Sequence, residues 1–132
     1  MEVRLLEGGR YEDARGCVRF CNDFNLSEVK RFYTVSNSKE RPLRGWICHK
    51  REKKWFFPLV GVTKIKIESD IHSTPTPTPT PILYTLDAEH PQVLCVPPGN
   101  WFLIEQNGTA EVQVFSNCFV DEFPNDDFRR AL

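Results

Sequence analysis

The sequence predicts an all-β protein, a sandwich or barrel built from short antiparallel strands. Short β-rich runs alternate with turn clusters, and few segments sustain an apolar period of 3.6 residues. The runs follow one another at close spacing, which favours a sandwich or barrel over βαβ units. The 132 residues include ten Phe and three Trp, enough apolar volume for the core of a single domain, residues 1–132.

Nine runs are predicted as strands because each is short, rich in apolar side chains and bounded by turn-forming residues. In chain order they are residues 16–21, 30–35, 45–49, 55–60, 63–68, 82–86, 92–96, 101–105 and 111–119. The run 55–60 is apolar and ends at Gly61, so we expect it to lie beside the strand 45–49 and to end in a turn.

The strand 45–49 carries the most informative residues of the chain. Side chains alternate between the two faces of a strand, so Ile47 and His49 point one way, while Trp46, Cys48 and Lys50 point the other. One face therefore presents an imidazole beside apolar groups. A core histidine with satisfied hydrogen bonds is the alternative to a functional one.

Two segments depart from the strand pattern. Residues 73–81 alternate Thr and Pro, and proline cannot donate to a strand ladder, so we expect an extended loop that connects or covers strands rather than a docking motif. Residues 121–132 place Asp126 and Asp127 before Arg129 and Arg130. That order complements a helix dipole and predicts a short C-terminal helix.

Composition excludes several classes of partner. Seventeen basic and eighteen acidic residues leave a net charge of −1, so no global field attracts nucleic acid or an anionic membrane. The five cysteines are scattered and contain no CxxC pair, which favours reduced thiols in a cytoplasmic protein. The N-terminal residues lack the pattern of a secretory signal, and no apolar run is long enough to span a membrane.

Five motifs carry a resemblance that covers most of the chain: residues 10–16, 29–33, 44–50, Gly61 and 97–101. In order and spacing they resemble the sugar 3,4-ketoisomerases that act on TDP-4-keto-6-deoxyglucose, the WxcM-like branch of the RmlC-like cupins. The resemblance implies a jelly-roll homodimer that binds a nucleotide-linked sugar and moves its carbonyl from C4 to C3 without a cofactor. The neighbouring branch contains the TDP-4-keto-rhamnose 3,5-epimerases.

Two positions depart from the family pattern. A cupin metal site needs two His on one strand face, a carboxylate and a later His. Here Ile47 and Phe102 occupy two of the three His positions, and only His49 remains, with Glu52 at the carboxylate spacing. We therefore expect no bound metal. The 3,5-epimerase reaction is disfavoured as well, because that branch carries its base at the position of Ile47.

The resemblance also assigns candidate site residues. His49 would be the base, because imidazole titrates near neutral pH, and Tyr33 would act as the acid or stabilise the enediolate oxygen. The substrate contacts implied are Arg15, Arg31, Arg44, Lys50 and Trp101. Guanidinium groups suit a pyrophosphate, although each arginine could equally form an ordinary ion pair, and Tyr33 could simply pack in the core. His72 and His90 lie in loops and are expected to be solvated.

Two hypotheses follow for function. In the first, the chain is a metal-free isomerase of a TDP-4-keto-6-deoxyhexose, and the retained Tyr33, Arg44 and His49 favour it. In the second, Ile47 and Phe102 mark a catalytically degenerate cupin that binds a sugar nucleotide or a protein partner without turnover. The first hypothesis is preferred. A third possibility, a purely structural module that docks through residues 73–81, is supported by composition alone. The apolar run 112–120 could supply a face of the implied homodimer.

Overall fold

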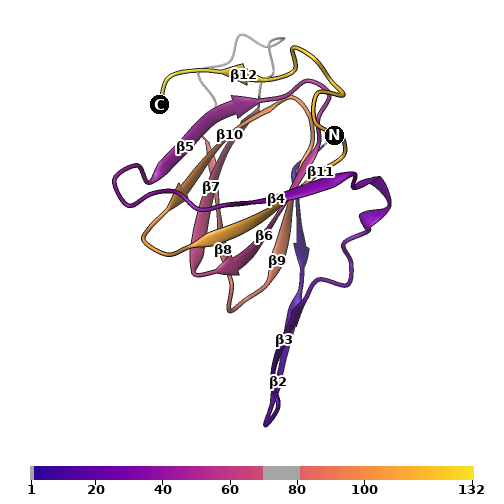
Figure 1. Cartoon of the computed structure of the whole chain (residues 1–132), viewed down its shortest axis with the longest axis vertical. Coiled ribbons are helices and arrows are strands. Elements are labelled where there is room, and N and C mark those ends of the chain that lie inside the picture. The colour runs from indigo at the N-terminus through magenta and orange to yellow at the C-terminus, as the bar shows by residue number, and fades with distance from the viewer. Residues whose placement is uncertain (1, 70–80) are drawn as a thin grey trace.

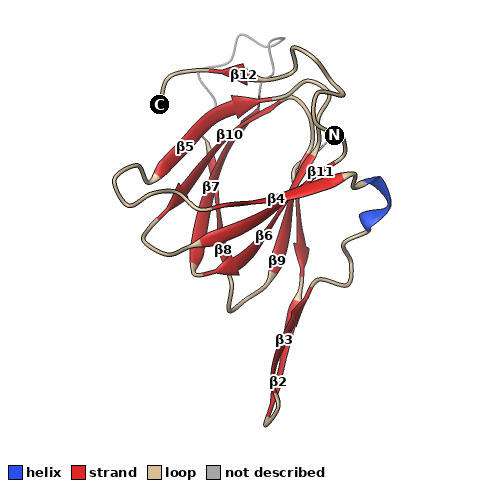
Figure 2. Ribbon diagram, viewed as in Figure 1, coloured by secondary structure: helices blue, strands red, loops and turns tan. Residues whose placement is uncertain are grey.

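The computed structural model describes residues 2–69 and 81–132, and this part of the chain is almost entirely β (Figure 2). A single turn of 3₁₀ helix, η1 (Leu26–Glu28), interrupts the strands. The strands are β1 (Arg4–Glu7), β2 (Gly9–Asp13), β3 (Gly16–Phe20), β4 (Arg31–Val35), β5 (Leu43–Cys48), β6 (Lys54–Val60), β7 (Val62–Ser69), β8 (Ile82–Asp87), β9 (Gln92–Val96), β10 (Asn100–Gln106), β11 (Glu111–Ser116) and β12 (Phe128–Arg129).

Ten of these strands form two antiparallel sheets that enclose one core (Figure 1). One sheet has the order β1-β9-β6-β11-β4 and the other β12-β5-β10-β7-β8. Buried side chains of both sheets meet between them, among them Phe56, Val112 and Val114 of the first and Ile65, Ile104 and Phe102 of the second. The all-β fold is confirmed, and each of the nine predicted strands is present.

Alternation along the strands decides which side chains reach the core. In β11, Val112, Val114 and Ser116 are buried, whereas Gln113 and Phe115 lie on the outer face. The apolar side chains of this strand are therefore mostly committed to the core. Within the run 112–120, the large apolar side chains that are exposed are Phe119 and Val120, which follow the strand.

The predicted pairing of strands 45–49 and 55–60 is wrong. β5 pairs with β10 and β12 in one sheet, while β6 pairs with β9 and β11 in the other, so the connection between β5 and β6 crosses from sheet to sheet. The turn at Gly61 is present, and its φ of 67° lies in the left-handed region that glycine adopts without strain.

The predicted C-terminal helix is also wrong. After β11 the chain forms a loop, in which Asp121 and Asn125 both adopt positive φ, and then adds β12 to the edge of β5. Positive φ values interrupt a right-handed helix. The buried carboxylate of Asp126 bonds to the loop that follows β5, and this tertiary contact replaces the local preference for a helix.

The hairpin β2–β3 extends away from the sandwich (Figure 1). Its two strands pair only with each other, and the side chains of Tyr11 and Val18 are 59% and 61% exposed. The predicted loop at 73–81 lies outside the described residues except for Pro81. In the described part of the chain, no helix has the length and apolar character needed to cross a membrane.

Candidate active site

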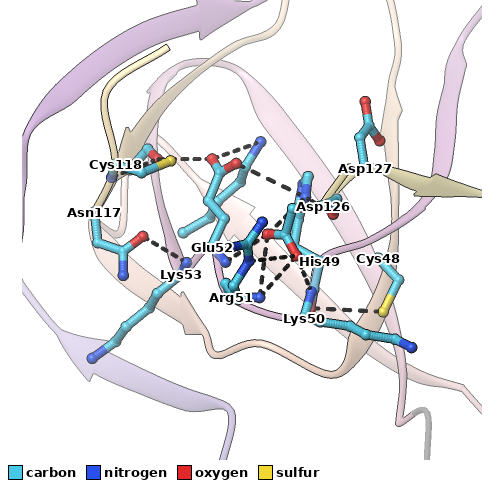
Figure 3. Close-up of polar contacts among 12 residues, drawn as sticks. Cys48, His49, Lys50, Arg51, Glu52, Lys53, Asn117, Cys118, Asp126 and Asp127 are labelled. Atoms are coloured by element: carbon cyan, nitrogen blue, oxygen red, sulfur yellow. Dashed lines mark hydrogen bonds and ion pairs between the residues drawn. The ribbon is translucent and has the colours of Figure 1, made fainter. Parts of the chain in front are cut away.

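A pocket of about 440 Å³ opens at one end of the sandwich, where β4 and β6 begin and β5 and β11 end. Antiparallel pairing brings the ends of β4, β6 and β11 to the same edge of one sheet, and His49, directly after β5 of the other sheet, lines the same pocket. Most of the residues that line it are polar or charged, and Figure 3 shows the polar contacts around His49, Glu52 and Asp126. The lining residues are Arg31, His49, Glu52, Lys54, Cys118, Phe119, Asp121, Phe123, Pro124, Asn125, Asp126 and Asp127.

His49 follows directly after β5, and its side chain is buried in the pocket wall. Its Nδ1 lies 2.9 Å from the backbone carbonyl oxygen of Asp126. A carbonyl oxygen can only accept, so Nδ1 carries the proton and Nε2 of the neutral ring keeps its lone pair. Nε2 is buried and has no hydrogen-bond partner among the described residues. An orphaned acceptor of this kind is unfavourable unless a ligand satisfies it.

The surroundings of His49 keep its ring neutral at pH 7. Burial is the largest influence and lowers the pKa of His49 below its ordinary value of 6.5, and the Lys54 ammonium lowers it further. Glu52, the carbonyl of Asp126 and the carboxylate of Asp127 oppose this shift without reversing it. The imidazole is therefore present in the form that can accept a proton.

Glu52 joins the strands that surround the pocket. Its Oε2 accepts hydrogen bonds from Ser116 Oγ at 2.7 Å and from Arg31 Nη2 at 3.2 Å. The same oxygen lies 3.5 Å from Lys54 Nζ, and Oε1 lies 3.8 Å from Nδ1 of His49. A buried carboxylate is tolerated because charged and hydrogen-bonding partners compensate for its lost hydration.

Lys54 connects this carboxylate to Tyr33. The buried ammonium donates to the phenolic oxygen of Tyr33 at 2.6 Å, and it lies 5.2 Å from the centre of the same ring. Arg31 lies on the same face of β4 as Tyr33, with its guanidinium also 5.2 Å from that ring. A phenol that accepts from an ammonium has its own O–H available to donate, and the ammonium would stabilise the phenolate.

The structure places two of the predicted site residues, His49 and Arg31, in the pocket lining, and a third, Tyr33, beside it in contact with Lys54. It places the other four elsewhere. Arg15 lies at the tip of the hairpin β2–β3, with its side chain 86% exposed and paired with Asp13. Arg44 lies near the opposite end of β5 from His49, where its Nε donates to Asn37 Oδ1 at 3.2 Å.

Lys50 and Trp101 are not part of the pocket lining. Lys50 lies in the loop after β5, and its ammonium lies 5.0 Å from the ring of Phe128. Trp101 lies in β10 on the outer face of its sheet. The guanidinium of Arg130 stacks on it at 4.8 Å and on Trp46 at 4.6 Å.

Sequence reasoning missed Lys54, Ser116 and Asp126. A local signal for Lys54 was present. It is a charged residue directly before the apolar run 55–60, and the first residues of β6 are buried. The role of Asp126 had no local signal, because its partners are 74 to 77 residues away.

The two missing imidazoles leave no space behind. Ile47 and Phe102 are register partners on β5 and β10, and both are buried in the core. Phe102 lies under the site, its ring centre 6.1 Å from that of His49. Within residues 2–69 and 81–132, no three His, Cys, Asp or Glu side chains converge as a metal-binding group, so the residues present do not fit a cupin metal. His90 is exposed, and His72 lies outside the described residues.

Solved structures share this fold over almost the whole chain. A 3,4-ketoisomerase from Helicobacter canadensis matches with a TM-score of 0.75 and 19% identity over 98% of this chain and 92% of its own. QdtA, a sugar 3,4-ketoisomerase from Thermoanaerobacterium thermosaccharolyticum in complex with TDP, matches with a TM-score of 0.74 and 17% identity, over 97% and 88%. The fold is that of the TDP-sugar ketoisomerases.

A third structure extends the likeness to an epimerase. A 3'-monoepimerase from Streptomyces bikiniensis in complex with dTDP-quinovose matches with a TM-score of 0.80 and 13% identity, over 96% of this chain and 68% of that one. By sequence, no family model and no curated protein matches the chain. The jelly-roll cupin fold implied by the sequence motifs is confirmed.

Proposed function

We propose that the chain is a cofactor-free isomerase that converts a TDP-4-keto-6-deoxyhexose to its 3-keto isomer. The observation that carries this proposal is the buried, unpartnered Nε2 of His49, which keeps its lone pair in a residue that lines a polar pocket. The structural neighbours support the substrate class, because they are TDP-sugar ketoisomerases and an epimerase, some of them in complex with TDP or a TDP-sugar.

We assign the role of base to His49, which lines the pocket, and the role of acid to Tyr33, which lies beside it against Lys54. Nε2 of His49 removes the proton from C3, the C3–C4 double bond forms, and Tyr33 donates its phenolic proton to the C4 oxygen. Lys54 stabilises the phenolate that remains. Tyr33 then recovers a proton from the C3 hydroxyl as the new carbonyl forms there, and His49 returns its proton to C4.

The imidazolium intermediate has two nearby carboxylates. Oε1 of Glu52 and Oδ2 of Asp126 lie 3.8 and 4.0 Å from Nδ1 of His49. These carboxylates stabilise the positive charge of the imidazolium. The burial of His49 and the nearby Lys54 ammonium both lower the pKa of His49 and so favour release of the proton. His49 can therefore both accept the proton as a neutral imidazole and return it as an imidazolium.

A homodimer is part of the proposal. The hairpin β2–β3 exposes Tyr11 and Val18 on two strands that pair only with each other, and an isolated two-stranded ribbon gains stability when a second subunit covers it. In that arrangement Arg15 could contact a nucleotide only in the pocket of another copy, because it is remote from the pocket of its own chain.

The cellular setting completes the proposal. A cytoplasmic location and a role in deoxysugar and polysaccharide biosynthesis follow from the resemblance to the ketoisomerases. Cys17, Cys21, Cys95 and Cys118 are free thiols, and the last two are buried, which agrees with a reducing compartment.

The second candidate is a pocket that binds a sugar nucleotide without turnover. The observation that favours it is the filling of two histidine positions by Ile47 and Phe102, which leaves His49 without a neighbouring imidazole to relay protons. Retention of a complete base and acid arrangement, from His49 through Glu52 and Lys54 to Tyr33, favours the isomerase.

The test is product formation. Purified protein would be incubated with TDP-4-keto-6-deoxyglucose, and the sugar followed by NMR, with TDP affinity measured separately by calorimetry. We expect a 3-keto product. Binding of TDP with no product at any pH from 5 to 9 would replace the isomerase with the binding-only cupin, and an absence of both would overturn the nucleotide-sugar assignment.

A further inference from the structure

Asp126 bonds the loop between β11 and β12 to the β5–β6 loop through its side chain (Figure 3). Its Oδ1 accepts from the amides of Lys50 and Arg51 at 2.9 and 3.0 Å, and its Oδ2 accepts from the amide of Glu52 at 2.9 Å. Three successive N–H groups that converge on one carboxylate form an anion-binding nest. Asp126 is 5% exposed, so these charge-assisted bonds are shielded from water.

The same residue makes the contact that orients the base. The backbone oxygen of Asp126 lies 2.9 Å from Nδ1 of His49, while the nearest carboxylate oxygen of Glu52 is 3.8 Å away, beyond hydrogen-bond distance. Among the described residues this carbonyl is therefore the group that fixes the proton on Nδ1. The carboxylate of Asp126 fixes its own carbonyl, because both belong to one residue held against residues 49–52.

We infer that Asp126 is a positioning residue for His49: its carboxylate anchors the loop, and its carbonyl holds the imidazole as the Nδ1–H tautomer, which leaves Nε2 as the unpartnered acceptor. The expected effect of Asp126 on turnover rests on the proposed function. The assignment of the Nδ1–H tautomer is independent of that function, because it follows from the contacts alone. Groups that orient a functional histidine in this way typically change activity by about 10- to 100-fold when they are removed.

Other contacts hold the loop when Asp126 is changed. Nη2 of Arg51 donates to the carbonyl of Pro124 at 2.6 Å, and its guanidinium lies 4.9 Å from the ring of Phe123. On the other side of Asp126, Arg130 stacks between two tryptophans and pairs with Glu68. A variant at Asp126 should therefore remain folded while the carbonyl loses its fixed position.

The experiment compares Asp126→Ala and Asp126→Asn with Glu122→Ala. Glu122 is the matched control, because its Oε1 also caps a backbone amide of the same loop, that of Phe119 at 2.9 Å, without contact to His49. Nitrogen-15 NMR of the histidine side chains distinguishes a protonated from an unprotonated ring nitrogen. Circular dichroism confirms the fold, and kcat and KM are measured with the TDP-4-keto sugar.

We expect a single Nδ1–H tautomer in the wild type and in Glu122→Ala, and a mixture of tautomers in Asp126→Ala. The kcat of Asp126→Ala should fall about 10- to 100-fold with KM little changed, and Asp126→Asn should lie between, because its amide oxygen still accepts from the nest. A pure Nδ1–H tautomer in both Asp126 variants would overturn the inference. If Asp126→Ala does not fold, the tautomer and kcat of Asp126→Asn test the inference in its place. A wild type that shows the tautomer and no turnover contradicts the proposed function alone.

Discussion

Replacement of Lys54 with methionine separates catalysis from packing in this site. The change keeps the length of the side chain and removes the ammonium that donates to Tyr33 at 2.6 Å and lies 3.5 Å from Glu52. At an effective dielectric constant of about 20, the pair with Glu52 attracts by about 5 kcal/mol before the costs of desolvation. Glu52 retains Ser116 at 2.7 Å and Arg31 at 3.2 Å, so we expect a net destabilisation of about 1–3 kcal/mol.

The kinetic effect should be larger than the effect on stability. Loss of one donor to a developing oxyanion costs about 10²–10³-fold in kcat, and Lys54 acts on that oxygen through Tyr33. The Lys54 cation also lowers the pKa of His49, so its removal should raise that pKa and move the acid limb of the pH–rate profile to higher pH.

Three assays test these expectations: urea denaturation, turnover followed by NMR, and kcat/KM as a function of pH. Lys64→Met is the control, because Lys64 lies between the buried Thr63 and Ile65 on β7 and therefore faces outward. A folded Lys54→Met protein with wild-type turnover and an unmoved acid limb would refute the role assigned to Lys54.

Three further predictions concern stability, pH and assembly. Phe56 is fully buried between the sheets, so Phe56→Ala should lower the free energy of unfolding by about 3–5 kcal/mol in urea, and a change near zero would contradict the assigned core. The folded-state pKa of His49 lies below its unfolded value of about 6.5. The free energy of unfolding should therefore rise with pH up to about 6.5 and fall in acid. His49→Asn should show a weaker dependence on pH, and the same dependence as in the wild type would contradict the burial assigned to His49. Tyr11→Asp with Val18→Asp should convert a dimer to monomers in sedimentation velocity, whereas a wild-type dimer in that variant would exclude the hairpin as the interface.

The strands were predictable because their signals are local. In β7 and β11, buried and exposed side chains alternate because one face of each strand packs on the core. This pattern is visible in the sequence of a single strand, whichever strands pair with it. The sheet partners could not be read in the same way. β5 and β6 are consecutive in sequence but pair in opposite sheets, because the connection crosses the sandwich.

The candidate site was only partly predictable for the same reason. Tyr33 and Arg31 share one face of β4, as alternation along a strand predicts, and His49 follows directly after β5. The remaining members depend on tertiary contacts. Asp126 favours a helix start by its local sequence, but its three amide partners lie 74 to 76 residues earlier, and they decide its conformation.

Motif position alone misplaced Arg44 and Trp101. Both match the family pattern in order, yet the structure uses Arg44 to bond Asn37 and Trp101 to stack on Arg130. An arginine or tryptophan has the same sequence signature whether it contacts a ligand or packs on its own chain. The choice depends on which end and which face of the strand carries it.

Deuterium exchange at C3 of the sugar tests the central claim that His49 is the base. The wild type, His49→Asn and the control His90→Asn, at an exposed histidine, would each be incubated with TDP-4-keto-6-deoxyglucose in D₂O and followed by NMR. We predict exchange at C3 in the wild type and in His90→Asn, and none in His49→Asn. Exchange at the wild-type rate in a folded His49→Asn protein would contradict the account.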